Sequence, residues 1–430
     1  MKTKLLKLLV VMTISITALF ALGITASAAT VGAFEVTGGV LYTDYAYAGD
    51  VLTIYTSTPL TIKNTTPSTP TTDRIEVADG VSANITLAGV NIDVSSQSDT
   101  AAFKIADNSA GNVTITLADG TTNTLKSGGN CAGIQKNGGV DTGTLTITGG
   151  TGLLNVYGGT VGAGIGSTGY KAASNITING GVIYAQGGEG VLHSTGFEYS
   201  EGSGAGIGSG QSGIATNIVI SGGVVSATGG RGAAGIGGGE SGNATDVVIS
   251  GGTVTAKFGQ NYDYHLGGDI IYCNGGGTIG SGAKGAASSA SIIGGFVTLI
   301  SYGENPYGYK NVGTADLSGA QNAIVIDKEW NGGACSGAIY GSPVITDDCT
   351  IPSECELVIQ NGSTLTIQNG ATLTNDGKIT NLGRIDNSGT IINNGKLAGL
   401  GKIDGSGTLI NNGTINNEIG DLLLSATDGV

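Results

Sequence analysis

Apolar and polar residues alternate along most of the chain in short runs that end at glycine or asparagine. Residues 253–256 are typical, because Val254 and Ala256 alternate there with Thr253 and Thr255. Such alternation places apolar side chains on one face of a β-strand and polar side chains on the other. Long helical patterns are missing after the first segment of the chain. The pattern therefore predicts an all-β protein built from many short strands.

A repeat of about 30 residues organises the central part of the chain. A Gly-Gly pair recurs in it, an isoleucine stands two residues before each pair, and two further isoleucines continue this series upstream. Each unit reads as three short strands separated by Gly or Asn corners, and two units carry insertions of about 12 residues. Stacking of such units predicts a parallel β-solenoid. The marker isoleucines are Ile85, Ile115, Ile147, Ile178, Ile220, Ile249 and Ile292, at intervals of 30, 32, 31, 42, 29 and 43 residues.

From Gly377 onward the repeat shortens to six residues. Isoleucine or leucine stands two residues after each glycine of this series, and asparagine or glycine stands four residues after it. Asparagine and glycine tolerate the left-handed turns that a tight corner needs, and the single branched residue is expected to point inward. Three hexads would complete one narrow triangular coil, so the repeat predicts a second, slimmer β-solenoid. The glycines are Gly377, Gly383, Gly389, Gly395, Gly401, Gly407 and Gly413.

Residues 83–134, which contain ANITLAGVNIDV, TAAFKI and VTITLADGTTNTLKSGGNCAGI, resemble secreted bacterial carbohydrate-binding β-helix proteins of the pectate-lyase-like superfamily. The units GAGIGS and NITINGGVIYAQGG, and the later YGSPVITDDCTIP, resemble repeats of large surface proteins of Gram-positive bacteria. The resemblance covers most of the chain after residue 76. It implies a right-handed parallel β-helix and, as in some relatives, binding of acidic plant polysaccharide or cellulose with calcium. It transfers no calcium ligand, so the metal-binding residues stay unknown.

The first segment has the composition of a secretory signal peptide. Lys2, Lys4 and Lys7 precede the apolar run 8–24, and the small residues 26–28 suit signal-peptide cleavage. This predicts a secreted, extracellular protein, with cell-surface association as an option and with no integral membrane segment once the leader is removed. The predicted organisation is signal peptide 1–28, N-terminal cap and strands 29–75, parallel β-helix 76–312, connecting segment 313–360, hexad-repeat solenoid 361–417 and tail 418–430.

Charge and cysteine content narrow the range of partners. The formal net charge of −14 argues against nucleic acid as a partner. An acidic polysaccharide would also be repelled unless a cation such as calcium bridged it to the protein.

Cys335, Cys349 and Cys355 lie close together in the sequence, and one pair among them is expected to form a disulfide whose partners the sequence does not decide. Cys131 is expected to be buried as a small apolar side chain.

The insertions supply the candidate functional residues. They run over 187–204 and 258–276 at the same corner of the repeat, and a third excursion covers 301–312. Long loops on a rigid scaffold often carry function. Aromatic rings offer flat apolar surface to sugar rings, and carboxylates accept hydrogens from hydroxyl groups or hold calcium. The candidate carbohydrate-binding residues are His193, Phe197, Glu198, Tyr199, Glu201, Tyr262, Asp263, Tyr264, His265, Asp269, Tyr272, Tyr307 and Tyr309.

The sequence favours non-catalytic recognition of an extended polysaccharide by a carbohydrate-binding or adhesive β-helix protein. Three alternatives stay open. In the first, the loops only shield the flank of the solenoid. In the second, the protein is a purely structural surface stalk. In the third, it is an enzyme, either a degenerate polysaccharide lyase or a glycoside hydrolase. A glycosidase needs two suitably spaced carboxylates, which Glu198 or Glu201 with Asp263 or Asp269 could supply. No catalytic residue is assigned, because the strand faces carry mainly Thr, Ser, Asn and Val. The oligomeric state is not decided.

Overall fold

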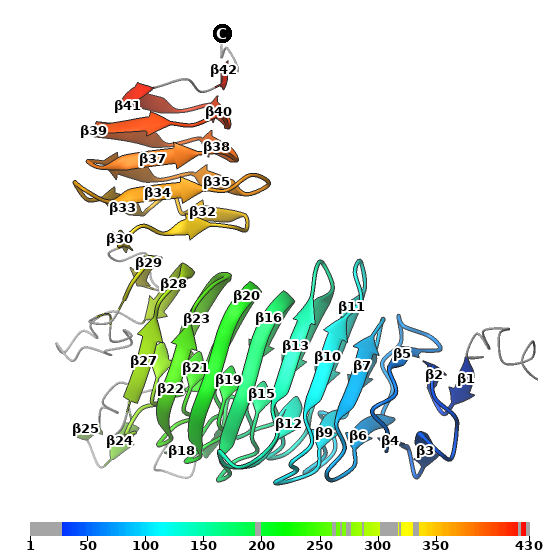
Figure 1. The fold of residues 1–430 in the computed structure, drawn as a ribbon. Coiled ribbons are helices and arrows are strands. Elements are labelled where there is room, and N and C mark those ends of the chain that lie inside the picture. The colour runs from blue at the N-terminus through cyan, green and yellow to red at the C-terminus, as the bar shows by residue number, and fades with distance from the viewer. Residues whose placement is uncertain are drawn as a thin grey trace, which may run out of the picture.

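The structure is a computed structural model that describes residues 28–193, 199–259, 264–266, 269–271, 277–285, 288–301, 317, 320–329, 335–419 and 423–426. Its described secondary structure consists of strands β1 to β42. A broad solenoid, β1–β29, is followed by the linking strand β30 and a narrow solenoid, β31–β42, which projects from the end of the broad one near β28 and β29 (Figure 1). Residues 1–27, which belong to the predicted signal peptide 1–28, lie outside the described residues.

Three parallel stacks of strands form the broad solenoid, and successive coils add one rung to each stack. Stack 1 contains β5 (Leu60–Asn64), β7 (Ala83–Leu87), β10 (Val113–Leu117), β13 (Leu145–Gly149), the first halves of β16 (Ala173–Gln186) and β20 (Ile214–Arg231), β22 (Asn243–Ile249) and β27 (Ser288–Ile292). Stack 2 contains β8 (Asn91–Asp93), β11 (Thr122–Lys126), β14 (Leu153–Tyr157), the second halves of β16 and β20, β23 (Thr253–Gly259), β28 (Gly295–Ser301) and β29 (Ala323–Glu329). Stack 3 contains β4 (Val51–Ile54), β6 (Arg74–Val77), β9 (Phe103–Ile105), β12 (Ile134–Lys136), β15 (Ile165–Gly166), β19 (Ile207–Gly208), β21 (Ile236–Gly237) and β26 (Ile279–Gly280).

The marker isoleucines of the sequence form one column in the core of stack 1. The register pairs Ile85 with Ile115 and Ile115 with Ile147, and the same pairing continues to Ile292. Each of the seven exposes at most 2% of its surface. Burial of one such side chain contributes about 1.5–3 kcal/mol, so the seven together contribute about 10–20 kcal/mol. The predicted parallel β-helix with coils of about 30 residues is confirmed.

The Gly-Gly corners between stack 1 and stack 2 stack too closely for side chains. Gly223 and Gly252 have φ values of +84° and +82°, a region that favours glycine. A Cβ on Gly252 would lie 2.6 Å from the carbonyl oxygen of Gly223. The recurring glycines are therefore needed both for backbone conformation and for the approach of successive coils.

Antiparallel strands close the N-terminal end of the broad solenoid. β1 (Ala29–Val31) pairs with β2 (Phe34–Thr37), β2 pairs with β5, and β3 (Tyr45–Ala48) pairs with β4. These strands cover the first rungs of stacks 1 and 3, where an open edge would invite pairing with another chain.

In the narrow solenoid three strands complete one coil. Ile379 pairs with Leu397 and Leu397 with Ile415, so each full coil in the six-residue repeat spans 18 residues, or three hexads. This confirms the predicted slim solenoid. Its parallel ladder begins with the pairing of β30 to β33 and of β31 to β34, upstream of the six-residue repeat. The strands are β31 (Val344–Ile345), β32 (Cys349–Ile351), β33 (Glu356–Ile359), β34 (Thr364–Ile367), β35 (Thr372–Asn375), β36 (Lys378–Asn381), β37 (Arg384–Asn387), β38 (Thr390–Asn393), β39 (Lys396–Asp404), β40 (Thr408–Asn411), β41 (Thr414–Ile419) and β42 (Leu423–Ala426).

Buried asparagines line the corners of the narrow solenoid. The side-chain amide of Asn375 donates to Oδ1 of Asn393, and that of Asn393 donates to Oδ1 of Asn411, both over 2.7 Å. The amide of Asn387 donates to the backbone carbonyl of Thr408 at 2.9 Å. Such amide ladders satisfy buried polar groups from one coil to the next.

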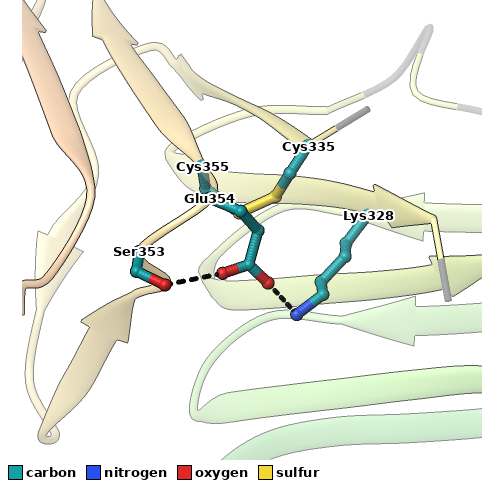
Figure 2. The surroundings of a disulfide bond; sticks show 5 residues. All are labelled: Lys328, Cys335, Ser353, Glu354 and Cys355. Carbon is teal, nitrogen blue, oxygen red and sulfur yellow. Dashed lines mark hydrogen bonds and ion pairs between the residues drawn. A yellow bond between two sulfur atoms is a disulfide. The ribbon is translucent and has the colours of Figure 1, made fainter. Parts of the chain in front are cut away.

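A disulfide joins the linking strand to the narrow solenoid at the junction of the two solenoids (Figure 2). Strand β30 (Cys335–Tyr340) reverses the chain by pairing antiparallel with β29, and it then pairs in parallel with β33. Cys335 is bonded to Cys355, which decides the pairing that the sequence left open. Lys328 of β29 forms an ion pair with Glu354, whose carboxylate also accepts a hydrogen bond from Ser353. Cys349 and Cys131 are buried free thiols, as expected for Cys131.

Candidate functional site

The two insertions form antiparallel hairpins at the edge of the broad solenoid. β17 (Val191–His193) pairs with β18 (Tyr199–Glu201), and β24 (Tyr264–Leu266) pairs with β25 (Asp269–Ile271). Both hairpins leave the coil after stack 2 and return at stack 3. The coil of β20 and β21 separates them, so their roots lie two coil rises apart, about 10 Å.

The sequence candidates divide between these hairpins and parts of the chain that lie outside the described residues. The register places His193 opposite Tyr199, and it places His265 opposite Ile270. Glu201 ends β18, Tyr264 begins β24 and Asp269 begins β25. The remaining candidates, Phe197, Glu198, Tyr262, Asp263, Tyr272, Tyr307 and Tyr309, lie outside the described residues.

The outward face of stack 2 lies next to these hairpins and carries two columns of polar and aromatic side chains. The buried partners in the same strands, such as Leu154 and Ile183, fill the core. The register aligns Asn91, Thr124, Asn155, Tyr184, Ser226 and Thr255 in one column. The other column is Asp93, Lys126, Tyr157, Gln186, Thr228 and Lys257.

Two tyrosines lie close together on this face. Tyr157 pairs with Gln186, and Tyr184 precedes Gln186 by two residues on the same strand. The strand spacing and the rise along a strand therefore put the two tyrosines about 8 Å apart on neighbouring rungs. Tyr184 exposes 50% of its surface. A hollow of about 350 Å³ adjoins both rings and is lined by Asn155, Tyr157, Tyr184, Ala185, Gln186, Ser226 and Thr228.

Two charged side chains, Lys126 and Asp93, lie beside Tyr157. The ammonium of Lys126 lies 5.6 Å from the ring centre of Tyr157, within the range of a cation–π interaction, and 3.2 Å from Oδ2 of Asp93. Burial acts to raise the pKa of Asp93, but hydrogen bonds from Ser95 and the ammonium of Lys126 outweigh it and lower that pKa. Asp93 is therefore an anion at neutral pH and holds Lys126 in place over the ring.

The same face is linked to the root of the first hairpin. The side-chain amide of Gln186 donates to Oε1 of Glu189 at 3.2 Å. Burial lowers the pKa of Lys257, and the carboxylate of Glu189 partly offsets this effect. Glu189 thus connects the polar columns to the point where the hairpin leaves the coil.

Sequence reasoning directed attention to the insertions and did not include Tyr157 or Tyr184. The signal was present in the alternation, because Leu154 and Val156 are apolar and the residues between and after them must face outward. The pairing of two tyrosines 27 residues apart becomes visible only when the coil register is known.

No family model, curated protein or solved structure matches the chain. The chain is an all-β protein with long parallel strand stacks of the β-helix or solenoid type. Within the described ranges, no three His, Cys, Asp or Glu side chains are grouped so as to hold a metal ion. The part of the chain that the structure describes also contains no helix long and apolar enough to cross a membrane.

Proposed function

We propose that this protein is a secreted or cell-surface carbohydrate-binding module that recognises an extended polysaccharide without catalysis. The observation that carries the proposal is the pair Tyr157 and Tyr184, which lie on neighbouring rungs of a flat face among amide and hydroxyl side chains. The leader-like first segment supports export. The resemblance of residues 83–134 to carbohydrate-binding proteins of the pectate-lyase-like superfamily points in the same direction.

The chemistry of this face suits sugar rings. A tyrosine ring presents apolar surface to the C–H face of a pyranose, and its hydroxyl group stays available for hydrogen bonding. Asn155 and Gln186 provide amide donors and acceptors beside the rings, and Ser226 and Thr228 provide hydroxyl groups on the next rung. Because rungs repeat about every 4.8 Å along the solenoid axis, the surface favours a polymer over a single sugar.

Calcium is not needed for this proposal. The described residues offer no group of three metal-ligating side chains, so the residues of the proposed face do not make a complete calcium site. If the polysaccharide is acidic, we propose that calcium bridges it to the protein, because a protein of net charge −14 would otherwise repel it. Binding measured with calcium and with a chelator separates the two cases.

The narrow solenoid supports a second candidate function, that of a structural stalk. The hexad part of the narrow solenoid repeats every 18 residues, and buried amide ladders join its coils. A rigid rod of this kind is suited to hold the broad solenoid away from an attachment point. As a sole function, a structural stalk predicts no affinity of the whole chain for any polysaccharide.

Affinity electrophoresis tests the proposed function. The mature protein is run in gels containing pectin, a soluble cellulose derivative or xylan, each with calcium or with EDTA. We expect retardation in at least one gel and a large reduction of it in Tyr184→Ala. Tyr55→Ala is the matched control, since both tyrosines expose 50% of their surface and Tyr55 follows β4 in the N-terminal region. Absence of retardation in every gel would contradict the proposal and favour the structural role.

A further inference from the structure

A groove runs along the Gly-Gly corner of the broad solenoid and ends against the base of the narrow one. Its volume is about 690 Å³. Five Gly-Gly pairs from successive coils form its floor, so it extends over four coil rises, about 19 Å. The pairs are Gly149 and Gly150, Gly180 and Gly181, Gly222 and Gly223, Gly251 and Gly252, and Gly294 and Gly295. The groove lies at the opposite end of the stack 2 strands from the hairpins.

One wall of the groove consists of equivalent residues on successive rungs. Asn179, Ser221, Ser250 and Ile293 each follow a marker isoleucine at the end of a stack 1 strand, and all four are exposed. Asn322, at the corner before β29, and the base of the narrow solenoid close the groove; the residues of this base are Ser342, Val344, Thr346 and Asp347. The lining therefore combines hydroxyl and amide groups with aliphatic side chains.

Three exposed aliphatic residues from different elements converge on this groove. Val224 of β20, Ile293 at the corner before β28 and Val344 of β31 expose 39%, 44% and 46% of their surfaces. Apolar side chains that gather in a concave, otherwise polar surface are typical of ligand sites. This convergence is not needed for the packing of the coils, because the three side chains point to solvent.

Hydrogen bonds and the disulfide fix the wall of the groove that the base of the narrow solenoid forms. The backbone N–H of Ser342 donates to Oδ1 of Asn322 at 3.2 Å, and the hydroxyl group of Thr253 donates to the carbonyl oxygen of Asp348 at 3.3 Å. The disulfide Cys335–Cys355 joins the same base to the linking strand (Figure 2). A wall fixed by these bonds makes the groove preformed, which lowers the cost of binding.

The charge of the lining limits the ligand. Asp347 is the charged residue among the described residues of the groove, and lysine and arginine do not occur among them. A polyanion would meet a carboxylate with no compensating cation. A peptide that binds by strand addition needs a free strand edge, whereas the floor consists of corners whose carbonyl groups already accept bonds, as Gly252 does from the N–H of Phe296 at 2.9 Å.

We propose that this groove is a second binding site, for an uncharged stretch of an extended glycan chain. The inference rests on the proposed carbohydrate-binding function and assigns a surface separate from the tyrosine face. Hydroxyl and amide groups of Ser221, Ser250 and Asn179 face the sugar hydroxyls. The aliphatic side chains and the bare glycine floor face the apolar surfaces of the rings.

Isothermal titration calorimetry on the full mature chain tests the site. The probes are cellohexaose, xylohexaose and mannohexaose as uncharged chains, and hexagalacturonate as the charged one. For at least one uncharged probe we expect two sites per chain. Ser250→Arg should fill the groove and weaken one of these sites at least about tenfold, while Tyr184→Ala removes the other. Ser98→Arg makes the same change on an exposed loop away from the groove and should bind like the parent protein.

Val344→Arg blocks the groove from its other wall and should repeat the effect of Ser250→Arg. Circular dichroism and thermal unfolding identify any variant that has lost its fold. Unchanged stoichiometry and affinity in both folded groove variants would overturn the second site and leave the proposed function standing on the tyrosine face. Failure of all four probes to bind the parent protein would overturn both.

Discussion

The broad and narrow solenoids solve the same packing problem with different corner residues. In the broad solenoid, glycine corners let coils approach closely while branched side chains fill a wide core. In the six-residue repeat of the narrow solenoid, one branched residue per hexad fills the core, and fully buried asparagine side chains join its corners. The wide coil has room for three distinct faces and for insertions at one corner, whereas each 18-residue coil is almost entirely committed to its own packing. We therefore expect recognition in the broad solenoid and mechanical support from the narrow one.

The largest effect is expected at a glycine corner of the broad solenoid. Gly252→Ala introduces a Cβ 2.6 Å from the carbonyl oxygen of Gly223 at a φ of +82°. Gly80→Ala imposes a similar φ of +71° but meets no atom within 4 Å. Urea denaturation should show a loss of about 3–4 kcal/mol for Gly252→Ala and of about 1 kcal/mol for Gly80→Ala. Equal losses would show that coil contact is not what requires the corner glycines.

The next largest effect tests the amide ladder of the narrow solenoid. Asn393→Ala removes a fully buried side chain that accepts from Asn375 and donates to Asn411. The loss leaves buried polar atoms unpaired, so the free energy of unfolding should fall by about 2–3 kcal/mol. The neighbouring Asn394→Ala removes side-chain hydrogen bonds to Asp376 and from Asn412 that are exposed, so water can replace them and the free energy of unfolding should change by less than about 0.5 kcal/mol. The same urea titration decides the matter, and similar losses for both variants would argue against the ladder.

A smaller effect concerns a buried cation in the broad solenoid. Lys136 exposes 2% of its surface and donates to the hydroxyl group of Thr142 at 2.7 Å. Burial lowers the pKa of Lys136 from 10.5 to about 8. Between these two pKa values the unfolded chain binds a proton that the folded chain does not, so the free energy of unfolding should rise with pH across this window.

Lys136→Met should remove this rise and raise the free energy of unfolding by about 2 kcal/mol at pH 7. Thr142 keeps a partner in the variant, since its hydroxyl group also donates to the carbonyl oxygen of Gly139. Lys171→Met, at an exposed position, serves as the control. Parallel pH profiles for Lys136→Met and the parent protein would show that burial of this amine carries no cost.

The sequence was sufficient to predict both solenoids, because each coil repeats one apolar residue at a fixed place. It did not locate the start of the narrow solenoid, where Leu357, Leu365 and Leu373 are eight residues apart instead of six. The additional residues lie in wider turns that contain Gly362 and Gly370, both at positive φ. The longer turns change the spacing of the leucines in the sequence, although the strands still pair in the same parallel ladder.

The disulfide and the tyrosine face depended on contacts that the sequence does not contain. Three cysteines within a short segment allowed several pairings, and the antiparallel reversal of β30 brought Cys335 to Cys355. Tyr157 and Tyr184 become neighbours through the coil register, which cannot be read from either strand alone. The insertions are easier to recognise in the sequence, because they interrupt the repeat.

The most direct test of the central claim is affinity electrophoresis of the double variant Tyr157→Ala/Tyr184→Ala, with Tyr264→Ala and Tyr55→Ala run alongside it. The tyrosine face predicts that the double variant loses most of its retardation and that adding Ser250→Arg in the groove removes the rest, while Tyr55→Ala is retarded like the parent protein. A smaller change in Tyr264→Ala would assign the second hairpin a supporting role. Full retardation of a correctly folded double variant would contradict the account.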